Sequence, residues 1–159
     1  MATSTYLKAD PLKGEATDSA HSEWLEISSF GFGVSQPTSS PGGTLGNQAR
    51  ADFHVFSVSK PICSASIDLL QHCAKGTEIA KMELEVCQAS DKKICYWKFE
   101  FEHVTVQSVS IGVGGSDRPM ESVTFSYNLV KYTYKPIKDG AEGTAVGPKG
   151  WDLTKNDVV

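Results

Sequence analysis

Glu100 and Glu102 are the two residues whose type and spacing most directly suggest catalysis. On one face of a strand their Cα atoms would lie about 6–7 Å apart, and paired carboxylates hydrolyse glycosidic bonds. The same face is expected to carry Lys98, with Glu83 and Glu85 on a neighbouring strand. Lys–Glu pairs of this kind stabilise a solvated sheet face. The sequence therefore favours a charged outer surface, and a hydrolase that uses Glu100 and Glu102 is kept as an alternative.

A second candidate for acid–base chemistry is His21, which follows Glu15 and Asp18 in a polar, turn-rich segment. A histidine beside a carboxylate acts as a general base when a nucleophile lies within reach. No serine or cysteine stands in a recognisable nucleophile elbow. We therefore interpret the segment as a hydrogen-bonded loop, and we predict no catalytic residue, no cofactor and no enzyme activity.

The four cysteines are Cys63, Cys73, Cys87 and Cys95, and none of them forms a CxxC motif. A zinc site is therefore not expected. Cys87 and Cys95 flank the turn at residues 89–93 and are placed to face each other across a hairpin. Buried, reduced cysteines that behave as small hydrophobic side chains are the common case in a protein made in the cytoplasm. The favoured interpretation is that all four are reduced, with the redox state of Cys87 and Cys95 left open.

Composition is typical of a single globular domain, which we expect to span residues 1–159. The net charge of −4 does not favour nucleic acid, which requires a basic face. No apolar run approaches the roughly 20 residues of a membrane span, so membrane insertion is not expected. The first 15 residues lack the basic and apolar regions of a signal peptide. We therefore expect synthesis in the cytoplasm.

Residues 94–111 show the strongest structural pattern, a long β-branched and aromatic stretch without glycine or proline. Trp97, Phe99 and Phe101 alternate with polar neighbours, as in a strand with one buried face. The alternation changes phase near His103 and again near Gln107, which predicts bulges or a corner. Fully extended, the stretch would span about 59 Å, but a compact chain of this length is only about 40 Å across. A strand this long must bend, which favours a closed or nearly closed barrel.

Other patterns predict strands at residues 5–9, 24–34, 51–59, 79–87 and 121–135. In 79–87 we expect the inward side chains to be Ala80, Met82, Leu84 and Val86. One helix is predicted, with Ser66 as its N-cap, Gly76 as its stop, and an apolar stripe of Ile67, Leu70, Cys73 and Ala74. The expected fold class is mainly β, an antiparallel β-barrel with one short flanking α-helix.

Residues 24–48 contain two features that suggest a partner. If Phe30 and Phe32 point into the barrel, Ser29 and Gly31 point out of it, and small residues there suggest that something approaches closely. Residues 36–48 are rich in Gly, Pro, Ser and Thr and are longer than an ordinary turn. This loop is the best candidate for reaching a partner, through Thr38, Gly42, Gly43, Thr44, Leu45 and Asn47.

Several short motifs occur in the order of one known family, over nearly the whole chain. They are Tyr6-Leu7-Lys8, Gly14-Glu15 with Asp18 and His21, Phe30-Gly31-Phe32-Gly33, the helix from Ser66 to Gly76, Phe101-Glu102-His103-Val104 followed by Ser108-Val109-Ser110, Pro119 with Glu121, Tyr132 with Tyr134, and Gly150-Trp151-Asp152. With these motifs the sequence resembles the haemolysin-coregulated protein (Hcp) family, the inner-tube component of bacterial type VI secretion systems. Ala16 and Gly31 stand where that family usually has serine.

The resemblance implies a β-barrel subunit that assembles into rings of six. The rings stack into a tube inside a contractile sheath, contraction expels the tube, and the lumen can hold and protect small effector proteins. The implied partners are other copies of the chain, the sheath, spike and baseplate proteins, and effectors. The implied route is secretion through the type VI machine. By this resemblance Ser29 and Gly31 face the lumen, and the 36–48 loop is expected to contact the next ring.

A carbohydrate-binding β-sandwich module is the remaining alternative. It would require Tyr96 and Trp97 to lie on the surface. The mass in solution separates the hypotheses, because a monomer suits a binding module or a hydrolase, whereas a ring of six suits the tube.

Overall fold

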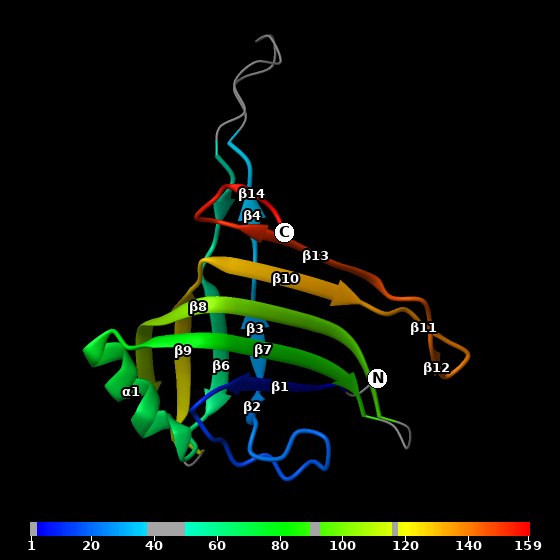
Figure 1. Cartoon of the computed structure of the whole chain (residues 1–159). Coiled ribbons are helices and arrows are strands. Elements are labelled where there is room, and N and C mark those ends of the chain that lie inside the picture. The colour runs from blue at the N-terminus through cyan, green and yellow to red at the C-terminus, as the bar shows by residue number, and fades with distance from the viewer. Residues whose placement is uncertain (1–2, 38–49, 90–92, 116–117) are drawn as a thin grey trace.

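The computed structural model describes residues 3–37, 50–89, 93–115 and 118–159. It is mostly antiparallel sheet with one helix (Figure 1). The elements are β1 (Thr3–Ala9), β2 (Leu25–Ile27), β3 (Ser29–Gly31), β4 (Val34–Ser35), β5 (Asp52–Phe53), β6 (Phe56–Pro61), α1 (Ala65–Lys75), β7 (Glu78–Gln88), β8 (Ile94–Gly112), β9 (Met120–Ser126), β10 (Leu129–Tyr134), β11 (Ile137–Lys138), β12 (Ala141–Glu142), β13 (Val146–Asp152) and β14 (Asp157–Val158).

Strand β8 connects the two halves of the sheet. Its first half lies between β7 and β10, and its second half pairs with β9. His103 has a positive φ of 54°, and the β8–β9 register shifts between Val106 and Ser108, so that Gln107 forms a bulge. Both predicted irregularities are therefore confirmed, and they let a strand of 19 residues bend around the core.

The sheet curls around its core without closing. The main strand order is β14-β13-β10-β8-β7-β1-β2, while β3 pairs with β6, and β6 pairs with β9. β2 and β3 are separated only by Ser28, but they join different neighbours. The mainly β, antiparallel class with one short helix is confirmed, whereas the barrel itself stays open because strand pairing is interrupted between β2 and β3.

An aromatic cluster fills the middle of the core. Phe56, Phe101 and Phe125 are fully buried, and the rings of Phe56 and Phe101 lie 4.6 Å apart. Phe30 and Phe32 are half-buried and pack against this cluster, as the alternation predicted. Tilted contacts between aromatic rings add to the stabilisation that comes from burying their apolar surface.

Helix α1 begins at Ala65 with Ser64 as its N-cap residue, and it ends at Gly76 with a left-handed φ of 69°. The prediction that Ser66 is the N-cap is therefore wrong. The Ser66 side chain lies in the core, because it donates a 2.8 Å hydrogen bond to Glu121. The predicted apolar stripe is also wrong, since Ile67 is 71% and Leu70 is 40% exposed. The buried helix residues are Ala65, Ser66 and Leu69.

Strand β7 departs from the prediction at one position. Met82, Leu84 and Val86 are buried as expected, but Ala80 is exposed and Ile79 takes the core position. The partner of Ile79 is Val104, next to the bend at His103. The strict alternation of β7 is lost where its neighbour turns.

An ion pair between Lys60 and Glu121 lies buried beneath α1. The two side chains are 1% and 0% exposed. Lys60 also donates to the Cys63 sulfur at 3.1 Å and to the Pro61 carbonyl at 3.2 Å. Glu121 accepts from Ser66, and its Oε2 atom has no partner among the described residues. This polar cluster ties β6, β9 and the start of α1 together.

Candidate functional site

The outward face of four adjacent strands is lined with small side chains. It comprises β3, β6, β9 and the second half of β8, and cross-strand pairing arranges its residues in two rows. We call this surface the hydroxyl wall; one row is Ser29, Ser59, Ser122 and Ser110, and the other is Gly31, Ser57, Thr124 and Ser108.

Alternation explains why these residues share a face. Phe30, Val58 and Val123 are cross-strand neighbours that point into the core, so the residues on either side of each point outward. An added Cβ at Gly31 would lie 3.0 Å from the Ser57 hydroxyl. The wall is therefore tightly packed at Gly31, and it carries no ionisable group among its eight members.

Ser29 and Gly31 point outward, as the sequence predicted, but their role in a lumen stays a prediction. The other six wall residues were not predicted from the sequence. Their signal was present as three pairs of small polar residues with one apolar residue between them, at 57 and 59, 108 and 110, and 122 and 124. Only the register shows that these pairs lie side by side.

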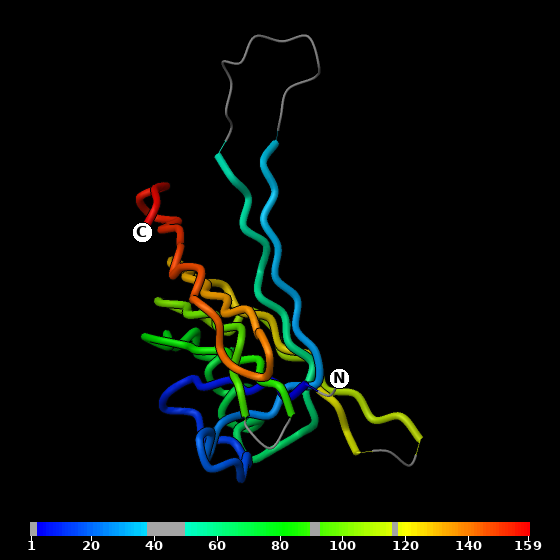
Figure 2. The backbone as a smooth tube through the Cα atoms, turned by 90° about the vertical axis from the view of Figure 1, so that its right-hand side faces the viewer, coloured from blue at the N-terminus to red at the C-terminus, as the bar shows by residue number. Residues whose placement is uncertain are grey.

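The predicted contact loop begins and ends at a two-stranded arm. β4 and β5 pair with each other and extend away from the rest of the sheet (Figure 2). The six loop residues named above, from Thr38 to Asn47, lie outside the described residues. Their role in contacting the next ring stays a prediction.

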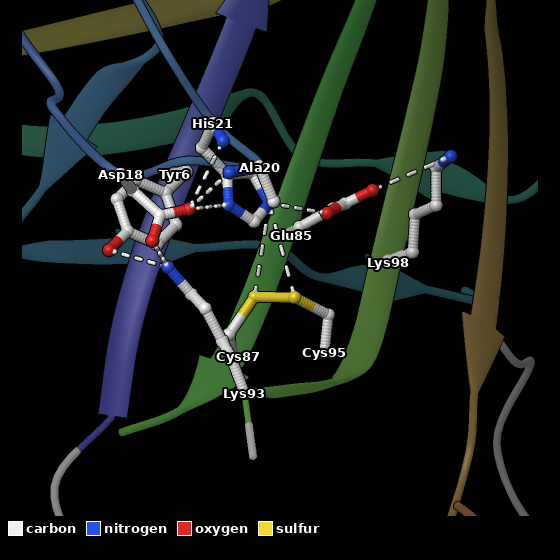
Figure 3. Close-up of a disulfide and its surroundings, with 9 residues drawn as sticks. All are labelled: Tyr6, Asp18, Ala20, His21, Glu85, Cys87, Lys93, Cys95 and Lys98. Atoms are coloured by element: carbon white, nitrogen blue, oxygen red, sulfur yellow. Dashed lines mark hydrogen bonds and ion pairs between the residues drawn. A yellow bond between two sulfur atoms is a disulfide. The ribbon is translucent and has the colours of Figure 1, made fainter. Parts of the chain in front are cut away.

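His21 is the centre of a second polar cluster, at the other end of the molecule from the arm. The ring is 1% exposed, and it stacks on Tyr6 with centroids 4.4 Å apart. Its Nδ1 lies 2.7 Å from Asp18, and its Nε2 lies 2.6 Å from Glu85 (Figure 3). An ionised carboxylate only accepts hydrogen bonds. Each nitrogen of the His21 ring therefore faces a carboxylate oxygen at hydrogen-bonding distance.

Asp18 holds the loop against the hairpin. It pairs with Lys93, and Lys93 also donates to the Tyr6 hydroxyl at 3.1 Å. The hydrogen bond from Lys93, followed by that from His21, lowers the pKa of Asp18 to about 2. The predicted hydrogen-bonded loop is thus present, but Glu15 is not part of it, because Glu15 pairs with Arg118 at 3.3 Å.

A disulfide joins Cys87 and Cys95 directly beside His21 (Figure 3). The expectation that all four cysteines are reduced is therefore wrong for this pair, while Cys63 and Cys73 are free. The reason lies in the hairpin, because Cys87 and Cys95 are cross-strand partners on β7 and β8. The facing arrangement that the turn suggested is present.

Glu100 and Glu102 lie on the charged outer face of β8. Lys98 is 3.6 Å from Glu100 and 3.7 Å from Glu85, while Glu102 is the cross-strand partner of Lys81. These groups are partly exposed, and Lys81 and Lys98 each lie within 4.0 Å of more than one glutamate on the two strands. The geometry is that of a salt-bridged surface, as the sequence favoured.

Replacing Glu100 or Glu102 with glutamine should change the free energy of unfolding by less than about 1 kcal/mol, because exposed ion pairs contribute only about 0.2–1 kcal/mol. Urea denaturation of each variant checks this. A loss of more than about 2 kcal/mol in either variant would show that these carboxylates do more than pair on the surface.

Comparison with known proteins decides the family. A family model described as "Type VI secretion system effector, Hcp" matches residues 6–134. The chain belongs to the Hcp family. It is 30% identical to protein hcp1 of Pseudomonas aeruginosa, over 98% of both chains. A solved structure described as a type six secretion system protein matches with a TM-score of 0.94 and 34% identity, over 99% of this chain and 100% of the other. Hcp1 from Salmonella typhimurium matches with a TM-score of 0.81 and 25% identity, over 100% of both.

As a member of the Hcp family, the chain is a type VI secretion protein. Neither alternative is supported. Trp97 is 37% exposed, as a carbohydrate module would require, but Tyr96 is half-buried. Among the described residues, no helix has the length and hydrophobicity needed to cross a membrane.

Proposed function

We propose that the chain is a tube subunit of a type VI secretion system, that it acts as one domain over residues 1–159, and that six copies form a ring. The hydroxyl wall supports this, because four strands present one continuous neutral surface of small side chains. Such a surface suits a bore through which different proteins must pass without being held tightly. In the ring the wall faces the lumen.

Contacts between subunits would use apolar groups that the single chain leaves exposed. An apolar patch lies across β8, β10 and β13, and each of its side chains is at least 36% exposed. Its members are Trp97, Tyr132, Tyr134 and Val146. A second exposed apolar pair lies on α1, where Ile67 is 71% and Leu70 is 40% exposed. Exposed apolar patches mark protein–protein contacts, and these two lie on different elements, as a closed ring with two distinct subunit faces requires.

The partners follow from the same proposal. They are neighbouring subunits, the sheath, spike and baseplate proteins, and small effectors in the lumen; nucleic acid, membrane insertion and catalysis are not part of the function. The subunit is made in the cytoplasm and leaves the cell through the secretion machine.

Native mass spectrometry of the purified chain tests ring formation. The expected species has about six times the 17.2 kDa of one chain. Only monomer at micromolar concentration would contradict the proposal, and negative-stain electron microscopy shows directly whether the particles are rings.

Gly31→Gln should leave ring assembly intact and abolish retention of effector. The added side chain leaves the sheet on the wall side, and its Cβ meets only the rotatable Ser57 hydroxyl within 4 Å. Because a ring repeats the change in every subunit, the bore narrows on all sides together. Co-purification of a co-expressed effector measures retention.

Glu100→Gln is the matched control, since it also introduces a glutamine side chain. Glu100 lies on the first half of β8, which is not part of the hydroxyl wall. It should retain effector like the unmodified chain. Unchanged retention in Gly31→Gln, with rings formed, would show that this face does not line the bore.

A further inference from the structure

Four potential metal ligands meet at the closed end of the β7–β8 hairpin. They are His21, Glu85, Cys87 and Cys95, and one donor atom from each lies within 4.8 Å of all the others. Figure 3 shows the histidine ring above the two sulfur atoms, with Glu85 beside it. Three separate segments contribute, namely the loop after β1, strand β7 and strand β8.

We infer that this cluster binds one zinc ion when the disulfide is reduced. The ligands are the two thiolates, His21 Nε2 and the Glu85 carboxylate. This set of sulfur, nitrogen and oxygen donors is one that Zn²⁺ prefers. The disulfide and the metal exclude each other, because both use the same sulfur atoms.

Distances support four-coordinate binding. His21 Nε2 lies 4.0 Å from the Cys87 sulfur and 3.9 Å from the Cys95 sulfur. Zinc at about 2.3 Å from sulfur and about 2.0 Å from nitrogen separates these atoms by about 3.5 Å at tetrahedral angles. The nitrogen therefore already stands near its required position. The main change is that the two sulfurs move apart after reduction.

Hydrogen bonding orients the histidine for this role. Asp18 accepts from Nδ1 at 2.7 Å, which turns Nε2 toward the sulfurs and Glu85. A carboxylate on the far nitrogen of a metal-binding histidine fixes the ring and makes it more basic. Lys93 in turn holds Asp18. This outer set of contacts is complete in the structure.

Burial and charge also suit a bound cation. His21 is 1% and Cys87 is 0% exposed, so water competes weakly for the metal. Two thiolates and one carboxylate carry three negative charges against the two of zinc. Lys98, 3.7 Å from Glu85, balances the excess.

Reduction of the Cys87–Cys95 disulfide needs only an added phosphine and water, and no protein group outside the cluster takes part. A phosphine reductant attacks one sulfur and the S–S bond breaks. Water then transfers its oxygen to phosphorus and its two hydrogens to the sulfurs, giving two thiols and a phosphine oxide. Zinc binding displaces both thiol protons and the proton of the hydrogen bond between Nε2 and Glu85.

Cobalt titration of the full chain tests the site. The protein is reduced with a phosphine, freed of reductant under nitrogen, and titrated with Co²⁺, which reports tetrahedral thiolate ligation by its visible and charge-transfer absorption. We expect one Co²⁺ per chain, displaced by Zn²⁺, and no such absorption before reduction. Absence of the bands in the reduced protein, or their presence in the disulfide form, would overturn the inference.

Variants identify the ligands. Cys95→Ser should abolish the thiolate bands, and Asp18→Asn should weaken binding about 10–100-fold by loosening the histidine. The matched control replaces both free cysteines, Cys63→Ser with Cys73→Ser, and should titrate like the unmodified chain. If the bands follow Cys63 and Cys73 instead, the metal lies elsewhere.

A measurement on the unmodified sequence keeps the test independent of variant folding. In the reduced protein, Zn²⁺ should protect Cys87 and Cys95 from iodoacetamide, while Cys63 and Cys73 are alkylated at the same rate with and without metal. Peptide mass spectrometry reads all four sites. Equal alkylation of Cys87 and Cys95 with and without Zn²⁺ would show that the pair serves only as a disulfide.

Discussion

Replacing Lys60 with methionine should destabilise the protein by about 3–5 kcal/mol, because it leaves the Glu121 carboxylate buried without its partner. Both side chains are almost fully buried, and one oxygen of Glu121 already lacks a hydrogen bond among the described residues. Water cannot reach the unpaired Glu121 carboxylate unless the contact between α1 and the sheet opens. Urea denaturation at a fixed protein concentration measures the loss.

The double variant Lys60→Met with Glu121→Leu separates charge from packing. Replacing a whole buried ion pair by apolar residues of similar volume is often neutral or stabilising. We therefore expect the double variant to recover most of the stability that the single variant loses. If the double variant is as unstable as Lys60→Met, the loss comes from packing beneath α1 and not from the unpaired carboxylate.

Phe101→Ala should lower the free energy of unfolding by about 3–5 kcal/mol, because it leaves a cavity in the core. The ring is 0% exposed and contacts Phe56 and Tyr127, with centroids 4.6 and 4.9 Å away. Small domains are stable by only about 5–15 kcal/mol. We expect a lower denaturation midpoint and less soluble protein.

Tyr134→Ala is the control, since it removes an aromatic ring that is 47% exposed from the neighbouring strand β10. Its effect on the unfolding of the single chain should be below about 1 kcal/mol, although it lies in the proposed subunit contact. Measurement below the concentration at which rings form keeps the two effects apart. Equal losses in both variants would mean that Phe101 does not occupy a packed core.

Local patterns in the sequence predicted the faces of the strands well. Side chains alternate along any strand, so the inward positions of Phe99 and Phe101 can be read from neighbours in the chain. Phase changes in the same pattern located the irregularities at His103 and Gln107. The resemblance of ordered motifs to the Hcp family predicted the fold class, and the observed elements and the likeness to a solved type six secretion system protein confirmed it.

The N-cap of helix α1 could not be predicted from neighbouring residues alone. Ser64 and Ser66 both precede an apolar run, and both are suitable N-caps by residue type. Ser66 lies inside because Glu121, on a strand far along the chain, accepts its hydroxyl. No feature near Ser66 in the sequence contains that information.

Tertiary structure alone decided the hydroxyl wall and the cluster around His21. The sequence by itself determined which residues are small, charged or sulfur-containing, and which side of its own strand each one occupies. It did not determine which strands are neighbours or in what register, because cross-strand pairing depends on backbone hydrogen bonds and packing between distant segments. The two rows of small wall residues follow from that register. The approach of His21 to Cys87 and Cys95 follows from the packing of its loop against the β7–β8 hairpin, whereas the turn at residues 89–93 already suggested that the two cysteines face each other.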